Sequence, residues 1–420
     1  MVKKIVSLFI CCLTALNLSS CTTEPSSNSE QVTITYSWWG GEDRHDKTIA
    51  ALEEFQKAYP NIKVKVEFGE WTGFKKKMNM KIAGNDEPDL MQINYDWLET
   101  YSKDGSGFYD LNKVSNQLDL SNFSNDVLNY GTKNGVLNAI PISMNSKTLF
   151  YNKSLMDKYN ISDLTTWDSL LSDTAKISDE GTYLLTLDKT NSWILPMAYI
   201  QEKTGRAFIT DDVALGFTEE DIKELLIFYK QLLDNKILSP LNDIRDYNFS
   251  ENNSIALVNW ASDSSKIEKN LSKNDTKAYV SQFPCSNGET PLTYVKPGML
   301  YAISKNTDHA EEAALLMNFL LNSPDAAKIQ GLDRGIPTSN ASIDALKDDN
   351  QLNGLQYDAV QKSSNTKNIL ISPYYENTLV QNICVEALTE VSFSTSSIDD
   401  IASNTYTDLT KTLETLNNMY

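Results

Sequence analysis

Alternation of apolar and polar residues predicts strands and helices in turn over the first hundred residues. Residues 32–39 are β-branched and aromatic, and residues 62–68 alternate apolar side chains with lysine and glutamate, so both ranges predict strands. Between them, apolar positions at helical spacing predict a helix that Asp43 or Asp46 caps and Pro60 ends. A second helix over 74–83 and a third strand over 90–93 follow. This order is typical of a parallel sheet with helices on its faces.

The later sequence repeats the alternation less cleanly. Helical patterns cover 167–177, with Thr166 as N-cap, and then 222–233, 315–320 and 409–420. Strand patterns cover 183–187, 255–259, 278–283 and 299–304. About 400 residues are more than one hydrophobic core usually organises, so we predict an α/β chain of two domains.

The N-terminal segment has the pattern of an export signal. Lys3 and Lys4 precede an apolar run over 5–16, and Leu18-Ser19-Ser20 stands directly before Cys21. This ending resembles the bacterial lipobox, although Ser20 takes the place usually held by Gly or Ala. The resemblance implies a signal peptide over 1–20, a lipid on Cys21, a polar tether over 21–30, and a protein held at the outer face of the cell membrane. The alternative is an ordinary secretory signal in which Cys21 is incidental.

Charge and composition exclude several classes of function. The formal net charge is −19, which argues against nucleic acid as a partner and against an electrostatic grip on anionic lipid. The two histidines lie far from any Cys/His cluster, so we expect no metal and no cofactor. Beyond the N-terminal segment only Cys285 and Cys384 remain, and the sequence leaves open whether they form a disulfide.

Tryptophan and carboxylate residues follow each of the first three predicted strands. These candidate site residues are Trp39 and Glu42, then Glu70 and Trp71, then Asp96 and Trp97. Ligands of such sheets bind beyond the carboxyl ends of the strands. Because all three loops lie at one such edge, these aromatic and carboxylate side chains predict a ligand site there. Either Trp38 or Trp39 is expected to pack in the core.

Further candidates lie elsewhere along the chain. Trp260 follows a predicted strand and precedes Asp263, while Trp193 precedes a helical pattern. Arg44 or Lys296 could hold the carboxylate of an acidic ligand, although Arg44 could equally pair with Glu42 or Asp46. Arg334 has the same ambiguity, and Trp167 is expected to be structural.

Several motifs in a fixed order resemble the extracellular solute-binding proteins of carbohydrate ABC importers. They are Trp38-Trp39-Gly40-Gly41, residues 55–64 (FQKAYPNIKV), Pro88-Asp89-Leu90-Met91-Gln92, Ile140-Pro141, Phe150-Tyr151-Asn152-Lys153, Thr166-Trp167-Asp168, residues 296–305 (KPGMLYAISK) with 311–314 (EEAA), and Arg334-Gly335-Ile336-Pro337. The resemblance implies a two-domain, type II periplasmic-binding-protein-like α/β fold with a ligand cleft at the hinged interface.

By this resemblance the first domain comprises 31–145 with 297–349, and the second comprises 147–295 with 350–420. The hinge lies near 145–147 and 296, which adds Asn145 to the candidate site, and Trp260 matches a ligand platform of the second domain. The expected function is to capture an oligosaccharide by domain closure and deliver it to ABC permease subunits, as a monomer and not as an enzyme. Aromatic rings can stack on the apolar faces of such a sugar while carboxylates accept hydrogen bonds from its hydroxyls. One alternative is a lipid-anchored glycosidase, which would also use tryptophans and paired carboxylates. Another is an adhesin or structural lipoprotein, which leaves the strand-end aromatics unexplained.

Overall fold

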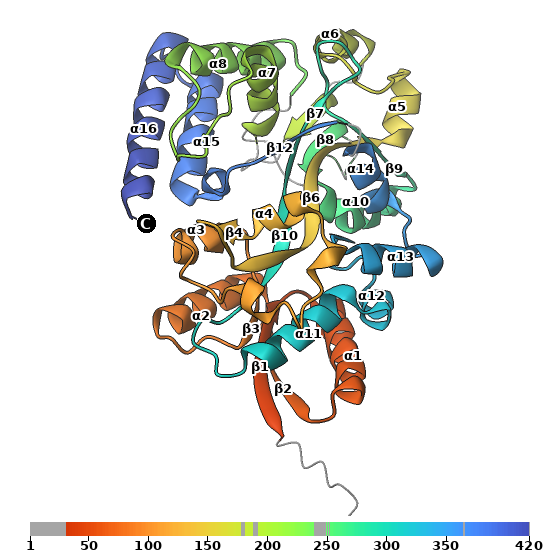
Figure 1. Ribbon diagram of the computed structural model, residues 1–420. Helices are drawn as coiled ribbons and strands as arrows, with labels where there is room; N and C mark the ends of the chain where they lie inside the picture. Colours follow the sequence, from red (N-terminus) through yellow and green to blue (C-terminus); the bar gives the residue numbers. More distant parts are fainter. Residues whose placement is uncertain are drawn as a thin grey trace, which may run out of the picture.

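The computed structural model describes residues 31–177, 181–187, 192–238, 249, 251, 253–363 and 366–419. The predicted signal peptide, Cys21 and the tether lie outside these residues. Two packed units share one sheet, and two long strands run from one unit into the other (Figure 1). The α/β prediction is confirmed. No helix among the described residues has the length and apolarity needed to cross a membrane.

The sheet has the strand order β2-β1-β3-β10-β6-β8-β7. Its first three strands are parallel: β1 (Val32–Trp39) lies between β2 (Ile62–Gly69) and β3 (Leu90–Ile93). The long strands β6 (Ala139–Asn152) and β10 (Leu292–Ile303) are antiparallel to each other. The far half of β6 lies between β8 (Ser254–Trp260) and β9 (Ala278–Ser281), and β8 pairs with β7 (Tyr183–Leu187). Short strands β11 (Ile336–Pro337) and β12 (Lys367–Leu370) pair with β6 and β10.

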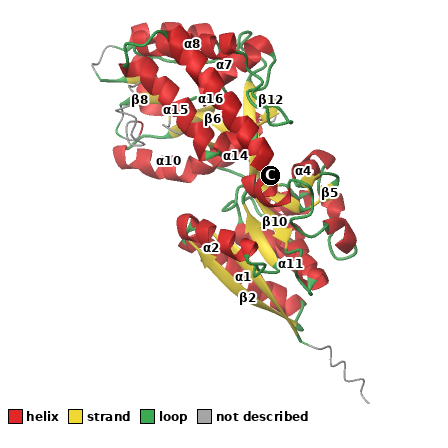
Figure 2. Ribbon diagram, turned by 90° about the vertical axis from the view of Figure 1, so that its left-hand side faces the viewer, coloured by secondary structure: helices red, strands yellow, loops and turns green. Residues whose placement is uncertain are grey.

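Helices pack on both faces of the sheet in each unit (Figure 2). The first unit contains α1 (Glu42–Ala58), α2 (Trp71–Ala83), α3 (Asp96–Ser102), α4 (Asn125–Tyr130), α11 (Ala310–Asn322), α12 (Pro324–Gln330) and α13 (Asn340–Asp348). The second contains α5 (Lys153–Tyr159), α6 (Trp167–Ser172), α7 (Ile194–Thr204), α8 (Glu219–Asp234), α10 (Ser264–Leu271), α14 (Leu355–Ser363), α15 (Thr378–Phe393) and α16 (Ile398–Met419).

Each unit has hydrophobic clusters of its own. One large cluster draws on residues 34–142 and 301–326, and the other on residues 149–294 and 371–416. The chain therefore passes between cores along β6 and again along β10. It crosses a third time between α13, whose Leu346 packs with Ala327, and α14, whose Leu355 packs with Phe150 of the second unit.

Several local predictions need correction. Neither Asp43 nor Asp46 caps α1, because the helix begins at Glu42 with Gly41 as an N-cap that makes no side-chain hydrogen bond. The predicted helix over 167–177 ends at Ser172 and continues as a 3-10 turn, although Thr166 does cap it with a capping box. The predicted strand over 299–304 is the second half of β10.

Both cysteines of the globular part are free thiols. Cys285 and Cys384 are buried in the second unit and form no disulfide. Burial raises the pKa of the Cys384 thiol, so it stays protonated and packs as a small apolar side chain.

Candidate functional site

The three strand-end tryptophans of the first unit lie together, as the sheet edge predicts. The ring of Trp39 lies 4.8 Å from that of Trp71 and 6.2 Å from that of Trp97, centroid to centroid. Trp97 is 1% exposed and packs in the core, so its ring offers no face to a ligand in this conformation. Trp39 and Trp71 are half-buried, and they are the two rings of this cluster that a ligand could reach.

Trp38 is the core member of its pair. It is fully buried, and its ring lies 4.8 Å from that of Tyr36 and 4.9 Å from that of Phe68. Its indole Nε1 donates to His45 Nδ1 at 3.1 Å, which ties β1 to the first turn of α1.

Asp96 is the strand-end carboxylate that contacts both an amide and a lysine side chain. It accepts a hydrogen bond from Asn94 Nδ2 at 2.6 Å, and Lys75 Nζ lies 3.6 Å from its other oxygen. The same Lys75 nitrogen lies 5.5 Å from the ring centroid of Trp71. A ring, a cation and a carboxylate thus meet at the end of the sheet. By contrast, Glu42 and Glu70 are exposed at the starts of α1 and α2.

The predicted pairing of Arg44 with Glu42 or Asp46 is wrong, because its guanidinium contacts Asp333 and Trp39 instead. Its Nε lies 2.6 Å from Asp333 Oδ2, and its two terminal nitrogens donate to the carbonyls of Asp333 and Trp39. Gly40 is what permits this, because a Cβ there would lie 2.4 Å from Arg44 Cδ. In this conformation the guanidinium holds the loop after α12 against the end of β1.

Arg334 is also a structural arginine. It is 4% exposed and donates to Gln92, Gln330 and Thr48. These are neutral side-chain oxygens of the first unit, so the guanidinium cross-links β3, α12 and α1 beneath the strand ends.

Trp260 is the centre of a second cluster, in the second unit. Lys147 Nζ lies 4.3 Å and Lys296 Nζ 4.6 Å from its ring centroid, and Lys296 also forms an ion pair with Glu376. Lys147 faces Trp260 across the β6–β8 pair, and Lys296 faces Asn145 across the β6–β10 pair. Directly opposed residues point to the same face of a sheet, so all four lie on one face.

Neither Lys147 nor Glu376 was predicted for the site. Lys147 ends the expected hinge stretch 145–147, and that position was the only signal for it in the sequence; in the structure its side chain is 1% exposed. Glu376 lies in a 3-10 turn, η8 (Pro373–Glu376), and no pattern in the sequence links it to Lys296, which is eighty residues away.

The remaining predicted site residues have different surroundings. Asn145 accepts from the backbone N–H of Ser262 at 3.1 Å and donates to its hydroxyl at 3.0 Å, which fixes the turn after β8. Asp263 is half-buried in that turn. Trp193 is 1% exposed and packs against Phe208, so it belongs to the core of the second unit in this conformation.

A cavity of about 370 Å³ lies between the two units. Its lining comes from α3, α4 and β4 (Thr132–Lys133) on one side, and from residues 209–213 and 370–374 on the other; the polar or aromatic members are Tyr95, Glu99, Asn129, Tyr130, Lys133, Thr210, Asp211, Ser372 and Tyr374. Burial raises the pKa of Tyr95, so its hydroxyl remains a donor at neutral pH.

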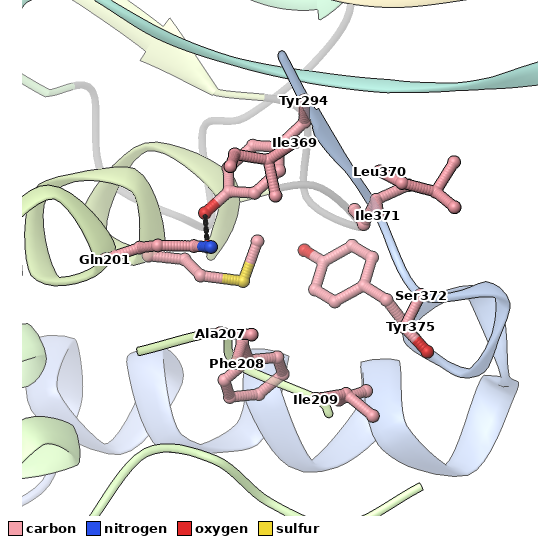
Figure 3. Close-up of a pocket in the computed structure, with 11 residues that line it drawn as sticks. Gln201, Ala207, Phe208, Ile209, Tyr294, Ile369, Leu370, Ile371, Ser372 and Tyr375 are labelled. Atoms are coloured by element: carbon pink, nitrogen blue, oxygen red, sulfur yellow. Dashed lines mark hydrogen bonds between the residues drawn. The ribbon is translucent and has the colours of Figure 1, made fainter. Parts of the chain in front are cut away.

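Two smaller cavities adjoin this space. One of about 50 Å³ brings Asp96 and Thr100 of α3 together with Tyr374 and Asn377. The other, of about 20 Å³, lies inside the second unit, where the Tyr294 hydroxyl donates to Gln201 Oε1 at 2.7 Å (Figure 3). It has room for about one water molecule. Because η8 carries both Tyr374 and Glu376, this turn links the interdomain cavity to the Trp260 cluster.

Comparison with known proteins gives one consistent family. The sequence profile of the bacterial extracellular solute-binding proteins matches residues 50–354. A multiple sugar-binding protein of Streptococcus mutans is 22% identical and covers 79% of this chain and 81% of its own length. Two solved structures cover 92% of this chain and 99% of their own chains. A periplasmic solute binding protein of Pectobacterium atrosepticum has a TM-score of 0.84 at 29% identity. A periplasmic oligogalacturonide binding protein of Yersinia enterocolitica, with saturated digalacturonic acid, has 0.82 at 28%.

Proposed function

This chain belongs to the bacterial extracellular solute-binding proteins, as a substrate-binding component of an ABC transporter and not an enzyme, and we propose that it captures an oligosaccharide by domain closure. The relatives described as binding multiple sugars and oligogalacturonide support a sugar as the ligand. We propose further that the closed form delivers this sugar to the membrane permease.

One observation carries the proposal: a cavity of about 370 Å³ is lined by both units, and tyrosines and acids are among its lining residues. The tyrosines supply faces for sugar rings, and the acids, amides and hydroxyls supply hydrogen-bond partners for sugar hydroxyls. Small-molecule sites occur preferentially at such boundaries between units.

The proposed mechanism follows from ligand contacts with both units. A ligand that touches both units in the closed form but only one in the open form binds the closed form more tightly. The difference between these two affinities sets how far the ligand shifts the equilibrium towards the closed form. The strands β6 and β10 connect the two cores, so rotation of one unit against the other bends these strands. Hydroxyl partners buried on closure supply specificity, because a wrong sugar leaves them without a hydrogen bond.

A thermal-shift screen with neutral, uronic and sialylated oligosaccharides tests the function. A ligand at one hundred times its Kd stabilises the folded state by about 2.7 kcal/mol, so its melting temperature rises measurably. Small-angle scattering with the best ligand should show a smaller radius of gyration, and chromatography should recover the sugar intact. If no glycan raises the melting temperature, or if the sugar is cleaved, the proposal is wrong.

The lipid anchor at Cys21 is part of the proposal. A lipidated Cys21 followed by the polar stretch 22–30 would keep the binding units beside the permease, as a monomer on the outer face of the membrane. Mass spectrometry of the membrane fraction should find an N-terminal diacylated cysteine. The Cys21→Ser variant should be released into the medium, and retention of that variant in the membrane would contradict the anchor.

A further inference from the structure

Two lysines converge on one tryptophan in the second unit of a chain whose net charge is −19. From the distances to the ring of Trp260, the Lys147 and Lys296 nitrogens lie within about 9 Å of each other. We infer that the oligosaccharide carries a carboxylate, which Lys147 and Lys296 receive beside Trp260. This inference rests on the proposed function and assigns the charge of its ligand.

Electrostatics favour an anion at this position. The two ammonium groups lie within about one Debye length of each other in physiological salt, so they repel. Lys147 is 1% exposed and Lys296 has a side chain that is 13% exposed, so water screens them little. A carboxylate that takes the place of Glu376 keeps the ion pair with Lys296 and also lies close to Lys147, whereas a neutral sugar gains only a hydrogen bond.

Glu376 shows that a carboxylate fits this position. Its side chain forms an ion pair with Lys296, and the Lys296 nitrogen lies 4.6 Å from the centroid of the Trp260 ring. A uronic or sialic acid presents the same group next to an apolar sugar face, so its ring can lie on the tryptophan while its carboxylate takes the place of Glu376.

The first unit repeats the arrangement. Lys75 lies 5.5 Å from the centroid of Trp71 and 3.6 Å from Asp96, so ring, lysine and acid recur there. Asp96 and Tyr374 line the same small cavity. Tyr374 and Glu376 both lie on η8, so the turn that carries Glu376 also contacts the cavity that Asp96 lines. A ligand with carboxylates on successive sugars would match both groups.

Calorimetry with matched ligands tests the inference. Digalacturonate and its methyl ester have the same sugars and differ in charge, and sialyllactose and lactose form a second pair that separates sialic from uronic acids. The wild-type protein should bind one free acid at least about ten times more tightly than its neutral counterpart. Raising the salt from 50 to 500 mM should weaken binding of the acid and leave the ester unchanged.

Variants identify the residues. Lys296→Met and Lys147→Met should each remove the preference for the acid, and Lys296→Met covers the case in which the buried Lys147 is needed for folding. Glu376→Gln should bind the acid at least as tightly as the wild type, because a competing carboxylate is gone. Lys158→Met is the matched control, since Lys158 lies 4.9 Å from the ring of Tyr159 and is exposed on α5.

The results separate this inference from the proposed function. Equal affinity for acid and neutral partner, or a preference that survives Lys296→Met, overturns the carboxylate assignment. If only neutral oligosaccharides stabilise the protein, the inference is wrong while the proposed function stands. If no oligosaccharide of any kind binds, the proposed function itself fails.

Discussion

Replacing Trp260 by alanine is the most direct test of where the sugar lies. The ring is half-buried at the end of β8, and two lysine nitrogens lie within 4.6 Å of its centroid. The Trp260→Ala variant therefore loses an aromatic face and the ring that lies beside the two lysine nitrogens.

The size of the effect follows from two contributions. Aromatic anchors at binding sites cost more than 1 kcal/mol when truncated, and a half-buried ring should stand near the lower end, at about 1–2 kcal/mol. Since 1.4 kcal/mol is a factor of ten, affinity should fall about 5- to 30-fold. The fold should lose about 1–2 kcal/mol as well, because part of the ring packs against the large core of the second unit.

Isothermal calorimetry at a temperature well below melting separates the two effects. Trp167→Phe is the control: this tryptophan is 6% exposed in the same unit, and its Nε1 donates to Glu202 at 2.6 Å. That variant should melt earlier and bind normally. If Trp260→Ala binds every stabilising glycan within a factor of two of the wild type, the reasoning that places the sugar on this ring is refuted.

Two further predictions concern the scaffold. Gly131→Ala should destabilise the protein by at least about 2 kcal/mol, because the new Cβ would lie 1.7 Å from the Ala139 carbonyl oxygen. Gly69→Ala is the control and should cost far less, because its Cβ would meet nothing within 4 Å. Chemical denaturation of both variants measures the free energies of unfolding. Burial alone would raise the pKa of Asp221, but hydrogen bonds from Arg206 and Thr218 outweigh it and hold the pKa below its ordinary value. The ionised Asp221 therefore stabilises the fold above about pH 4, and this stability is lost as the pH falls through the folded-state pKa. The difference in melting temperature between the wild type and Asp221→Asn should narrow towards pH 3 and stay constant from pH 6 to 8.

The elements that are local in sequence could be predicted. The strands and helices of the first hundred residues follow from apolar periodicity, and because parallel strands end at one edge, the gathering of Trp39, Trp71 and Trp97 follows too. Apolar periodicity does not show how deeply each of these tryptophans is buried. Trp97 is 1% exposed because it belongs to a cluster with Phe74 of α2, Ile93 of β3 and Leu300 of β10, and this packing depends on several separate elements.

Contacts between distant parts of the chain could not be predicted. Arg44 pairs with Asp333 in the loop after α12, which returns to the first unit only after β10. Lys296 of β10 pairs with Glu376, which follows the third crossing between the units. A single sequence offers several acids to each of these cations at closer spacing. For Arg44 the predicted pairing with Glu42 or Asp46 is wrong, because Gly40 lets the side chain turn towards the loop after α12.

The position of the lysines also bears on how binding and closure are coupled. Lys147 and Lys296 lie on β6 and β10, the strands that join the two cores, and Glu376, the partner of Lys296, lies on η8, which contacts α3 of the first unit. A carboxylate that displaces Glu376 from Lys296 would change a contact of the second unit at the same point where that unit meets the first. In the proposed closure, ligand charge and domain orientation are then linked through one ion pair. The Glu376→Gln variant, which lacks that pair, should consequently differ from the wild type in its ligand-free radius of gyration, whereas the Lys158→Met control should not.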